Sequence, residues 1–205
     1  RKRPTEGEVA FISQSGAMGS AILDWSEEAN VGFSSFVSVG NMIDVDFGDL
    51  IDYFGQDPKT GSIIMYMESV SDAKKFMSAA SSFSRSKPIM VIKSGKYAKS
   101  AEAVASHTGS LAGEDTVYNA AFKRAGITRV DDVDDLFSCS EILAKQELPK
   151  GPNIAVITNA GGPGIMATDA ILDWDGKMAQ LGDSTVQQLK EYLPEAASTS
   201  NPVDV

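Results

Sequence analysis

The sequence predicts an α/β fold: a doubly wound parallel sheet, followed by part of a second α/β domain. Three observations indicate this. Residues 8–30 follow the order strand, tight turn and helix, which is the βα unit. The pattern then repeats with helices of about 10 to 15 residues between apolar runs, as expected of a mainly parallel sheet covered on both faces. After a linker at residues 148–152 that contains proline and glycine, the pattern starts again.

The first domain contains five predicted strands. Each is a short apolar run, rich in residues that favour strands, that ends at turn residues. The runs occupy residues 8–13, 33–39, 62–67, 89–93 and 127–130. Asp57-Pro58-Lys59-Thr60-Gly61 turns the chain into the third strand, and Lys87-Pro88 leads into the fourth.

Helices are predicted after these strands because apolar side chains recur there at helical spacing. They occupy residues 17–30, 47–54, 73–84, 114–125 and 133–145. The side chains expected to face inward in the first two helices are Ile22, Trp25, Leu50, Ile51 and Phe54. Ser71-Asp72 supplies an N-cap for the third helix, and Gly126 ends the fourth.

The linker Leu148-Pro149-Lys150-Gly151-Pro152 is followed by the start of a second domain. The elements predicted there are a strand over 153–158, a glycine-rich turn over 159–164, helices over 165–172 and 185–193, and the beginning of a strand at 201–205. These are too few strands for a complete sheet. The predicted organisation is therefore a first domain over 5–147, a linker over 148–152, and the first part of a second domain of the same class over 153–205.

Composition excludes several classes of partner. Eighteen basic and 28 acidic residues give a formal charge of −10, which disfavours binding to nucleic acid or to an anionic membrane. One cysteine, Cys139, and one histidine, His107, exclude an internal disulfide and leave no zinc-ligand spacing, so we predict no metal site and a cytoplasmic location. No apolar run suits a signal peptide or a membrane span, and the missing initiator Met indicates a fragment of a longer protein.

Two strand-to-helix turns share a design that suits an anion. They are Ser13-Gln14-Ser15-Gly16 and Asn159-Ala160-Gly161-Gly162-Pro163-Gly164. Each ends a strand and opens a helix, where free backbone N–H groups and the positive helix end favour a phosphate. Glycines at such turns also serve packing alone, so each turn by itself keeps both interpretations open. The chain has no lysine-bearing Walker loop and no full dinucleotide fingerprint.

The single histidine lies in a run of small residues, Ala105-Ser106-His107-Thr108-Gly109-Ser110-Leu111-Ala112-Gly113. Its unperturbed pKa is close to neutrality, so it can act as a nucleophile, a proton carrier or a ligand. A packed or solvated ring is the alternative interpretation. Small residues leave a loop free to adopt two positions, which is typical of a mobile catalytic segment.

Other polar residues that follow predicted strands also keep two interpretations. Glu68 stands at the carboxyl end of the third strand, where α/β sheets place their sites, but it also suits a capping or solvated carboxylate. Asn41, Asp44 and Asp46 either contact a bound ligand or form an Asx turn or N-cap. Lys93 ends the fourth strand and could face a phosphate, pair with Glu68 or reach solvent.

Five ordered motifs together resemble one protein family. They are Ser13-Gln14-Ser15-Gly16, Ser38-Val39-Gly40-Asn41 with Asp44 and Asp46, Ser106-His107-Thr108-Gly109-Ser110-Leu111-Ala112-Gly113, Thr158-Asn159-Ala160-Gly161-Gly162-Pro163-Gly164, and Asn201-Pro202-Val203-Asp204. This set is similar to the NDP-forming acyl-CoA synthetases, which include ADP-forming acetyl-CoA synthetase and, more distantly, succinyl-CoA synthetase. The resemblance implies a flavodoxin-like ligase domain followed by the first part of a second ligase domain.

The resemblance also implies roles for individual residues. His107 matches the histidine that the family phosphorylates, and Glu68 matches the glutamate that orients it. The helices that begin at the two turns match the pair whose N-termini hold the phosphohistidine. The residues implied to bind phosphate are Ser13, Ser15, Gly16, Gly161, Gly162 and Gly164. CoA, and ADP or ATP with Mg, would be bound mainly by a CoA-binding domain and an ATP-grasp domain or subunit outside this chain.

The implied function is that of an acid-thiol ligase, an NDP-forming acyl-CoA synthetase. It would convert acyl-CoA, ADP and phosphate into an acid, CoA and ATP through an acyl phosphate and a phosphohistidine, in an oligomeric enzyme, and the fragment alone would be inactive. Two alternatives stay open. One is the ligase-like regulatory region of a protein lysine acetyltransferase, fused to an acetyltransferase domain, and the other is a flavodoxin-like module that only binds a ligand.

Overall fold

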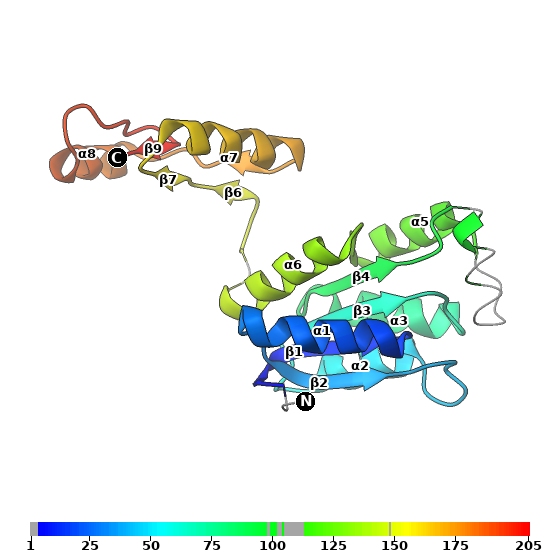
Figure 1. Ribbon diagram of the computed structural model, residues 1–205. Helices are drawn as coiled ribbons and strands as arrows, with labels where there is room; N and C mark the ends of the chain where they lie inside the picture. The colour runs from blue at the N-terminus through cyan, green and yellow to red at the C-terminus, as the bar shows by residue number, and fades with distance from the viewer. Residues whose placement is uncertain (1–3, 98, 102–103, 105–112, 148) are drawn as a thin grey trace. The chain divides into compact units, whose positions relative to one another are not determined.

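The computed structural model describes residues 4–97, 99–101, 104, 113–147 and 149–205 (Figure 1). The chain divides into two compact units, one up to residue 147 and one from residue 148. Each unit contains parallel strands with helices between them, and the predicted α/β class is confirmed.

Unit 1 is built on one five-stranded parallel sheet. The strands are β1 (Glu6–Ser13), β2 (Phe33–Ser38), β3 (Ser62–Met67), β4 (Ile89–Lys93) and β5 (Thr128–Val130). Their order in the sheet is β2-β1-β3-β4-β5, which is the flavodoxin-like order, and every neighbouring pair is parallel. All carboxyl ends therefore meet at one edge of the sheet, where such folds place their ligands.

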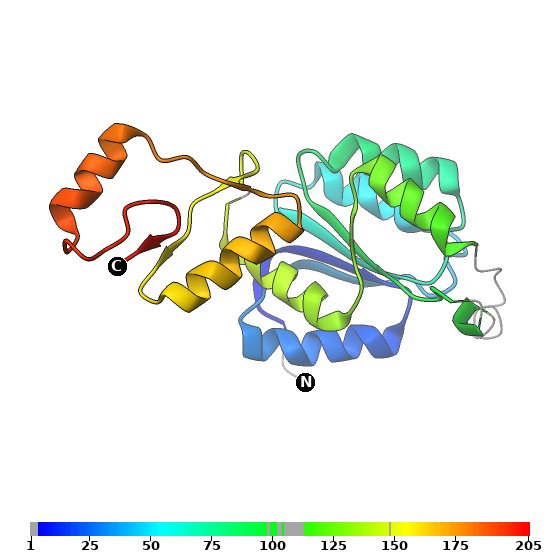
Figure 2. The ribbon, with the colours of Figure 1, turned by 90° about the horizontal axis from the view of Figure 1, so that it is seen from above.

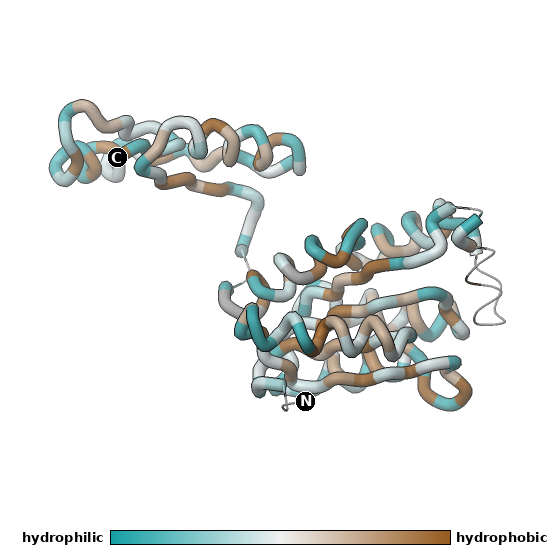
Figure 3. Tube along the Cα trace, in the orientation of Figure 1, coloured by the Kyte–Doolittle hydropathy of each residue, from teal (hydrophilic) through white to brown (hydrophobic). Residues whose placement is uncertain are grey.

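Helices cover both faces of this sheet. They are α1 (Gly16–Ala29), α2 (Phe47–Gln56), α3 (Ala73–Phe83), α5 (Asp115–Ala125) and α6 (Val133–Lys145). Seen from above, α1 and α6 lie on one face and α2, α3 and α5 on the other (Figure 2). Because helices lie on both faces, the central strands β3 and β4 are buried on both sides, and Figure 3 shows apolar stretches running along the strands.

Two apolar clusters fill the space between the sheet and its helices. On the α1 and α6 side, Phe11 belongs to one cluster with Ile22 of α1, and its ring centroid lies 5.0 Å from that of Phe36 of β2. On the other side, Ile51 and Phe54 of α2 are buried with Met65, as the helical spacing predicts. These clusters fix the strands and leave their carboxyl ends as the polar edge.

Asp46 joins the first turns of α2 and α3. Its Oδ1 accepts hydrogen bonds from the N–H groups of Gly48 and Asp49 at 2.8 and 3.2 Å, and Asp49 returns the capping box. Its Oδ2 accepts a hydrogen bond from Ser71 Oγ at 3.0 Å and pairs with Lys75 Nζ at 2.9 Å. For Asp46, the N-cap interpretation is confirmed, whereas Asn41 and Asp44 lie exposed in the preceding loop.

In its described residues, 149–205, unit 2 contains four short strands and two helices. They are β6 (Asn153–Ile154), β7 (Ile157–Thr158), α7 (Gly161–Asp173), β8 (Lys177–Met178), α8 (Asp183–Tyr192) and β9 (Val203–Asp204). β6 pairs with β8 and β7 with β9, each in parallel. The strand predicted at the end of the chain corresponds to β9, and β8 was not predicted.

Two predictions for unit 2 were wrong. The single strand expected over 153–158 is divided into β6 and β7, because the Asn201 side chain hydrogen-bonds the backbone where the two strands meet. Its Oδ1 accepts from Val156 N–H and its Nδ2 donates to Ile154 O, each at 2.9 Å. The helix expected from residue 165 begins at Gly161. Pro163 fits this first turn because a first-turn N–H has no partner within the helix.

No helix in the described ranges is long and apolar enough to cross a membrane.

Candidate functional site

The turn that opens α1 is closed by a hydroxyl group. Ser13 Oγ donates to Ser15 O at 2.7 Å and accepts from Ser15 N–H at 3.1 Å, and Ser13 is completely buried. Ser15 is the N-cap of α1, with its Oγ accepting from Met18 N–H at 3.3 Å. In the part of the chain that the structure describes, the N–H groups of Gly16 and Ala17 have no hydrogen-bond acceptor, so they are available to an anion.

The turn that opens α7 repeats this arrangement within unit 2. Thr158 Oγ1 donates to Ala160 O at 2.9 Å and accepts from Ala160 N–H at 3.0 Å. Ala160 is the N-cap and has no side chain that could cap the helix. Gly161 and Gly162 therefore supply two first-turn N–H groups that no described residue accepts from.

Two of the residues singled out in the α7 turn have neighbours that limit phosphate binding. A Cβ at Gly164 would lie 2.9 Å from Thr158 Cγ2, and the Gly164 N–H already donates to Ala160 O at 3.2 Å, so this glycine allows close packing of the helix. A Cβ at Gly161 would lie 3.1 Å from Asp204 Oδ2. A carboxylate of the chain itself thus lies beside this positive helix end.

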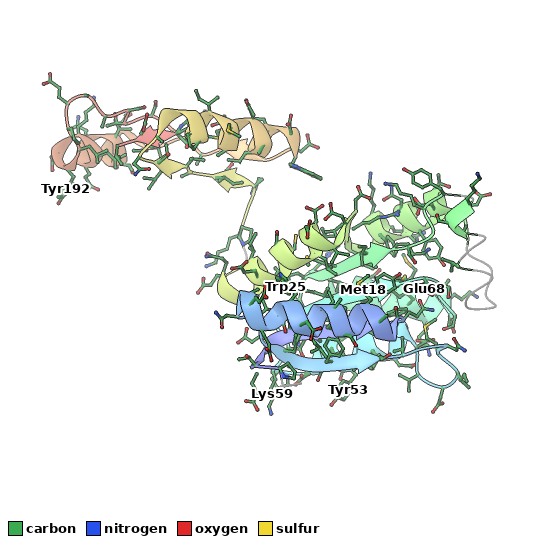
Figure 4. The ribbon with its side chains drawn as sticks, in the orientation of Figure 1. Met18, Trp25, Tyr53, Lys59, Glu68 and Tyr192 are labelled. Atoms are coloured by element: carbon green, nitrogen blue, oxygen red, sulfur yellow. The ribbon has the colours of Figure 1, made fainter. Side chains whose placement is uncertain are left out.

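Glu68 is held against the α1 turn by Gln14. Gln14 Oε1 accepts hydrogen bonds from the N–H groups of Glu68 and Ser69 at 2.7 and 3.0 Å, and its Nε2 donates to Ser69 Oγ at 3.1 Å. The Gln14 N–H in turn donates to Tyr66 O at 3.1 Å. Glu68 is 7% exposed and follows the end of β3 (Figure 4). Sequence reasoning did not identify Gln14, because its partners lie more than fifty residues away.

Lys93 ends β4 beside Met67 of β3 and is also buried. Its Nζ donates to Ser94 O and lies 4.5 Å from the centroid of the Tyr118 ring. Burial lowers the pKa of this ammonium; the Asp115 and Glu68 carboxylates act in the opposite direction. The solvent-reaching interpretation of Lys93 is therefore wrong, and among the described residues it forms no ion pair with Glu68.

His107 and the rest of segment 105–112 lie outside the described residues. The structure thus brings together Ser15, Gly16 and Glu68 at one edge of unit 1, with Lys93 at the end of a neighbouring strand. Within the described part, no three His, Cys, Asp or Glu side chains are grouped as metal ligands would be. A carboxylate, free helix-end amides and a buried ammonium are groups suited to binding and transferring an anion.

Comparison with known protein families and proteins gives one consistent match for unit 1. Residues 6–143 match the model of the succinyl-CoA ligase-like flavodoxin domain. The chain is 43% identical over its full length to ADP-forming acetate–CoA ligase I of Archaeoglobus fulgidus, covering 30% of that protein. Over 98% of its length it is 42% identical to the alpha subunit of ADP-forming acetate–CoA ligase II of Pyrococcus furiosus, covering 44% of that subunit.

A solved structure agrees with these sequence similarities. The dinucleotide-forming acetyl-coenzyme A synthetase 1 of Candidatus Korarchaeum cryptofilum, in complex with phosphate and ADP, matches all of this chain with a TM-score of 0.93 and 42% identity. The chain covers 44% of that structure. It therefore spans less than half the length of each of these relatives.

Proposed function

The chain belongs to the succinyl-CoA ligase-like flavodoxin domain family, and from this premise we propose that it is the central part of an NDP-forming acyl-CoA synthetase. The whole enzyme interconverts acyl-CoA, ADP and phosphate with an acid, CoA and ATP. Similarity to ADP-forming acetate–CoA ligases supports this activity and makes acetate the first acid to test. The related synthetase in complex with phosphate and ADP supports these two ligands.

The proposed reaction has three steps. Phosphate attacks the thioester carbonyl, the C–S bond breaks, and CoA leaves as a thiolate with formation of an acyl phosphate. A ring nitrogen of His107 then takes the phosphoryl group and the carboxylate of the acid leaves. Finally ADP takes the phosphoryl group from His107 to give ATP. CoA and the Mg nucleotide are bound mainly by CoA-binding and ATP-grasp domains or subunits outside this chain.

The observation that carries the proposal is the Gln14 bridge, because it fixes the backbone of Glu68 to the turn that opens α1. A carboxylate held in this way can accept the N–H of an imidazole and leave the opposite ring nitrogen free to react. The amides of Gly16 and Ala17 donate to phosphoryl oxygens, and Ser15 caps the helix that presents them. Ser13 shapes the turn from inside.

The start of α7 is the second proposed phosphate position. Gly161 and Gly162 offer the amides there, and the hydroxyl-closed turn before them has the same form as the turn before α1. Asp204 must be displaced, or its charge balanced, before an anion approaches Gly161, so this position binds phosphate more weakly than the α1 position.

The setting proposed for this chain is an oligomeric enzyme of the cytoplasm. The alternative of a regulatory region in a protein lysine acetyltransferase has no support among the relatives named above, which are ligases.

Labelling of the parent enzyme tests the proposed function. Incubation with ATP labelled on the γ-phosphate, in the presence of magnesium, is expected to give an acid-labile, base-stable phosphoprotein. His107→Asn abolishes the label, and Glu68→Gln lowers its rate of formation on the order of 100-fold because the imidazole loses its orienting carboxylate. Glu27→Gln, the same change at an exposed glutamate of α1, leaves the rate unchanged. A parent enzyme that never labels would refute the phosphohistidine mechanism.

A further inference from the structure

Lys93 is a buried cation that the proposed reaction does not yet use. It is the last residue of β4, and its Cα is the register partner of Met67, the residue before Glu68. Its ammonium lies at the polar edge rather than in the core, close to Gly95 of the loop that follows β4. A Cβ built at Gly95 would be only 3.7 Å from Lys93 Nζ. The side chain is nevertheless 5% exposed.

The immediate surroundings of this ammonium stabilise it incompletely. An ammonium has three N–H donors, and within the described residues the acceptor of Lys93 is a single carbonyl, that of Ser94. The Tyr118 ring, 4.5 Å away, adds a cation–π contact. Burial of a charge with so few partners is costly, and an additional anion would lower that cost.

Nearby carboxylates leave this charge available. Asp115 attracts Lys93, but its two oxygens accept a bidentate pair of hydrogen bonds from Arg129 at 3.0 and 2.8 Å. Arg129 also repels Lys93. Glu68 attracts Lys93 from the neighbouring strand, yet no ion pair joins the two where the structure is described. Since no described carboxylate forms an ion pair with Lys93, its charge remains available to an anionic ligand.

We propose that Lys93 binds the phosphoryl group of the reaction, through its ammonium, at the Glu68 end of the site. The proposal rests on the proposed function for the identity of the anion and adds a residue to it. A phosphoryl group has three oxygens that accept hydrogen bonds and carries up to two negative charges, which fits the charge of Lys93 and the donors that no described residue accepts from.

Titration of the 205-residue chain with inorganic phosphate, followed by ³¹P NMR, tests this assignment. Lys93→Met removes the charge at similar length and is expected to weaken phosphate binding about tenfold or more, the effect of one lost charge-assisted hydrogen bond. Lys93→Arg keeps the charge and binds more tightly than Lys93→Met. Lys96→Met is the control, since Lys96 is half exposed and pairs with Asp131 on the surface. The Lys96→Met chain is expected to bind phosphate as tightly as the wild type.

Thermal unfolding without phosphate separates a binding role from a structural one. Lys93→Met is expected to be at least as stable as the wild type, because an apolar side chain replaces a poorly compensated buried charge. A variant that is less stable but binds phosphate within twofold of the wild type overturns the proposal. A wild-type chain that binds no phosphate, or that binds acetate as well as phosphate, also overturns it. If Lys93→Met does not fold, Lys93→Gln and Lys93→Arg give the same comparison.

The parent enzyme distinguishes this proposal from the proposed function. A parent in which Lys93→Met is phosphorylated as fast as the wild type refutes the role of Lys93 and leaves the phosphohistidine mechanism intact. A parent that never labels refutes that mechanism, and the phosphate titration of the chain then decides the role of Lys93 separately.

Discussion

Replacing Gln14 by leucine tests how strongly the α1 turn holds Glu68. Leucine has a similar size and cannot hydrogen-bond. The change removes the acceptor of two backbone N–H groups, those of Glu68 and Ser69, and the donor to Ser69 Oγ. A buried donor left without an acceptor costs about 1 to 3 kcal/mol. Gln14 is half-buried and water can reach part of this region, so we expect a total loss of about 2 to 4 kcal/mol.

Urea unfolding measures this loss in unit 1. With a slope of about 2 kcal/mol per molar urea, the middle of the usual range, the midpoint should fall by about 1 to 2 M. The matched control is Gln56→Leu. Gln56 is exposed, and among the described residues its side chain bonds only to Asp52 of its own helix, so we expect a change within about 0.5 kcal/mol.

Amide hydrogen exchange gives a second measurement on the same variant. The amides of Glu68 and Ser69 should exchange faster in Gln14→Leu, while those in the middle of β3 keep their protection. If Gln14→Leu lost less than about 1 kcal/mol, or no more than Gln56→Leu, the bridge would not be what holds Glu68, and the argument from it to the proposed function would fail.

Three further predictions concern packing and protonation. Gly55→Ala should destabilise unit 1 by about 1 to 3 kcal/mol in urea unfolding, because its Cβ would lie 2.3 Å from the Phe83 ring; Gly162→Ala, which meets open space, should be neutral or stabilising by up to about 1 kcal/mol. Burial lowers the pKa of Lys93, so the folded chain releases this proton at a lower pH than the unfolded chain does. The wild type should therefore gain stability relative to Lys93→Met as the pH rises toward 10.5 in a urea series; a constant difference would contradict this. Burial, with a contribution from a nearby aspartate, raises the pKa of Cys139, so iodoacetamide at pH 8 should alkylate it more slowly in the folded chain than in urea; equal rates would contradict the raised pKa.

Local signals predicted most of unit 1. The bounds of β3, β4 and α6 agree with the sequence because turn and capping residues stand next to apolar runs at these points. Asp132, for example, accepts from the N–H of Asp135 at 2.7 Å and begins α6 where the sequence places it. The flavodoxin-like order follows from the resemblance and is confirmed by the register of the five strands.

Features that depend on distant residues were not predictable in this way. The Asn201 side chain divides the first strand of unit 2, and no pattern near residue 155 announces it. The same holds for Gln14, which sequence reasoning treated as one more residue of a turn although it holds the backbone of Glu68. Burial of Lys93 beneath the Tyr118 ring likewise depends on a helix that follows it in the chain. Each case is a side-chain contact with backbone or ring atoms far away in sequence, which periodicity does not encode.

The carboxylate of Asp46 has a consequence for how the molecule opens. It is shared by the first turn of α2 and by Ser71 and Lys75 at the start of α3. If α2 detached alone, Ser71 and Lys75 would lose the Asp46 carboxylate as a partner. If α3 detached alone, Asp46 would still cap α2 but would lose its ion pair with Lys75. Opening of either helix therefore weakens the other, and we expect the two to behave as one cooperative unit. These two helices would then be lost in a single step as the domain begins to unfold, rather than one after the other.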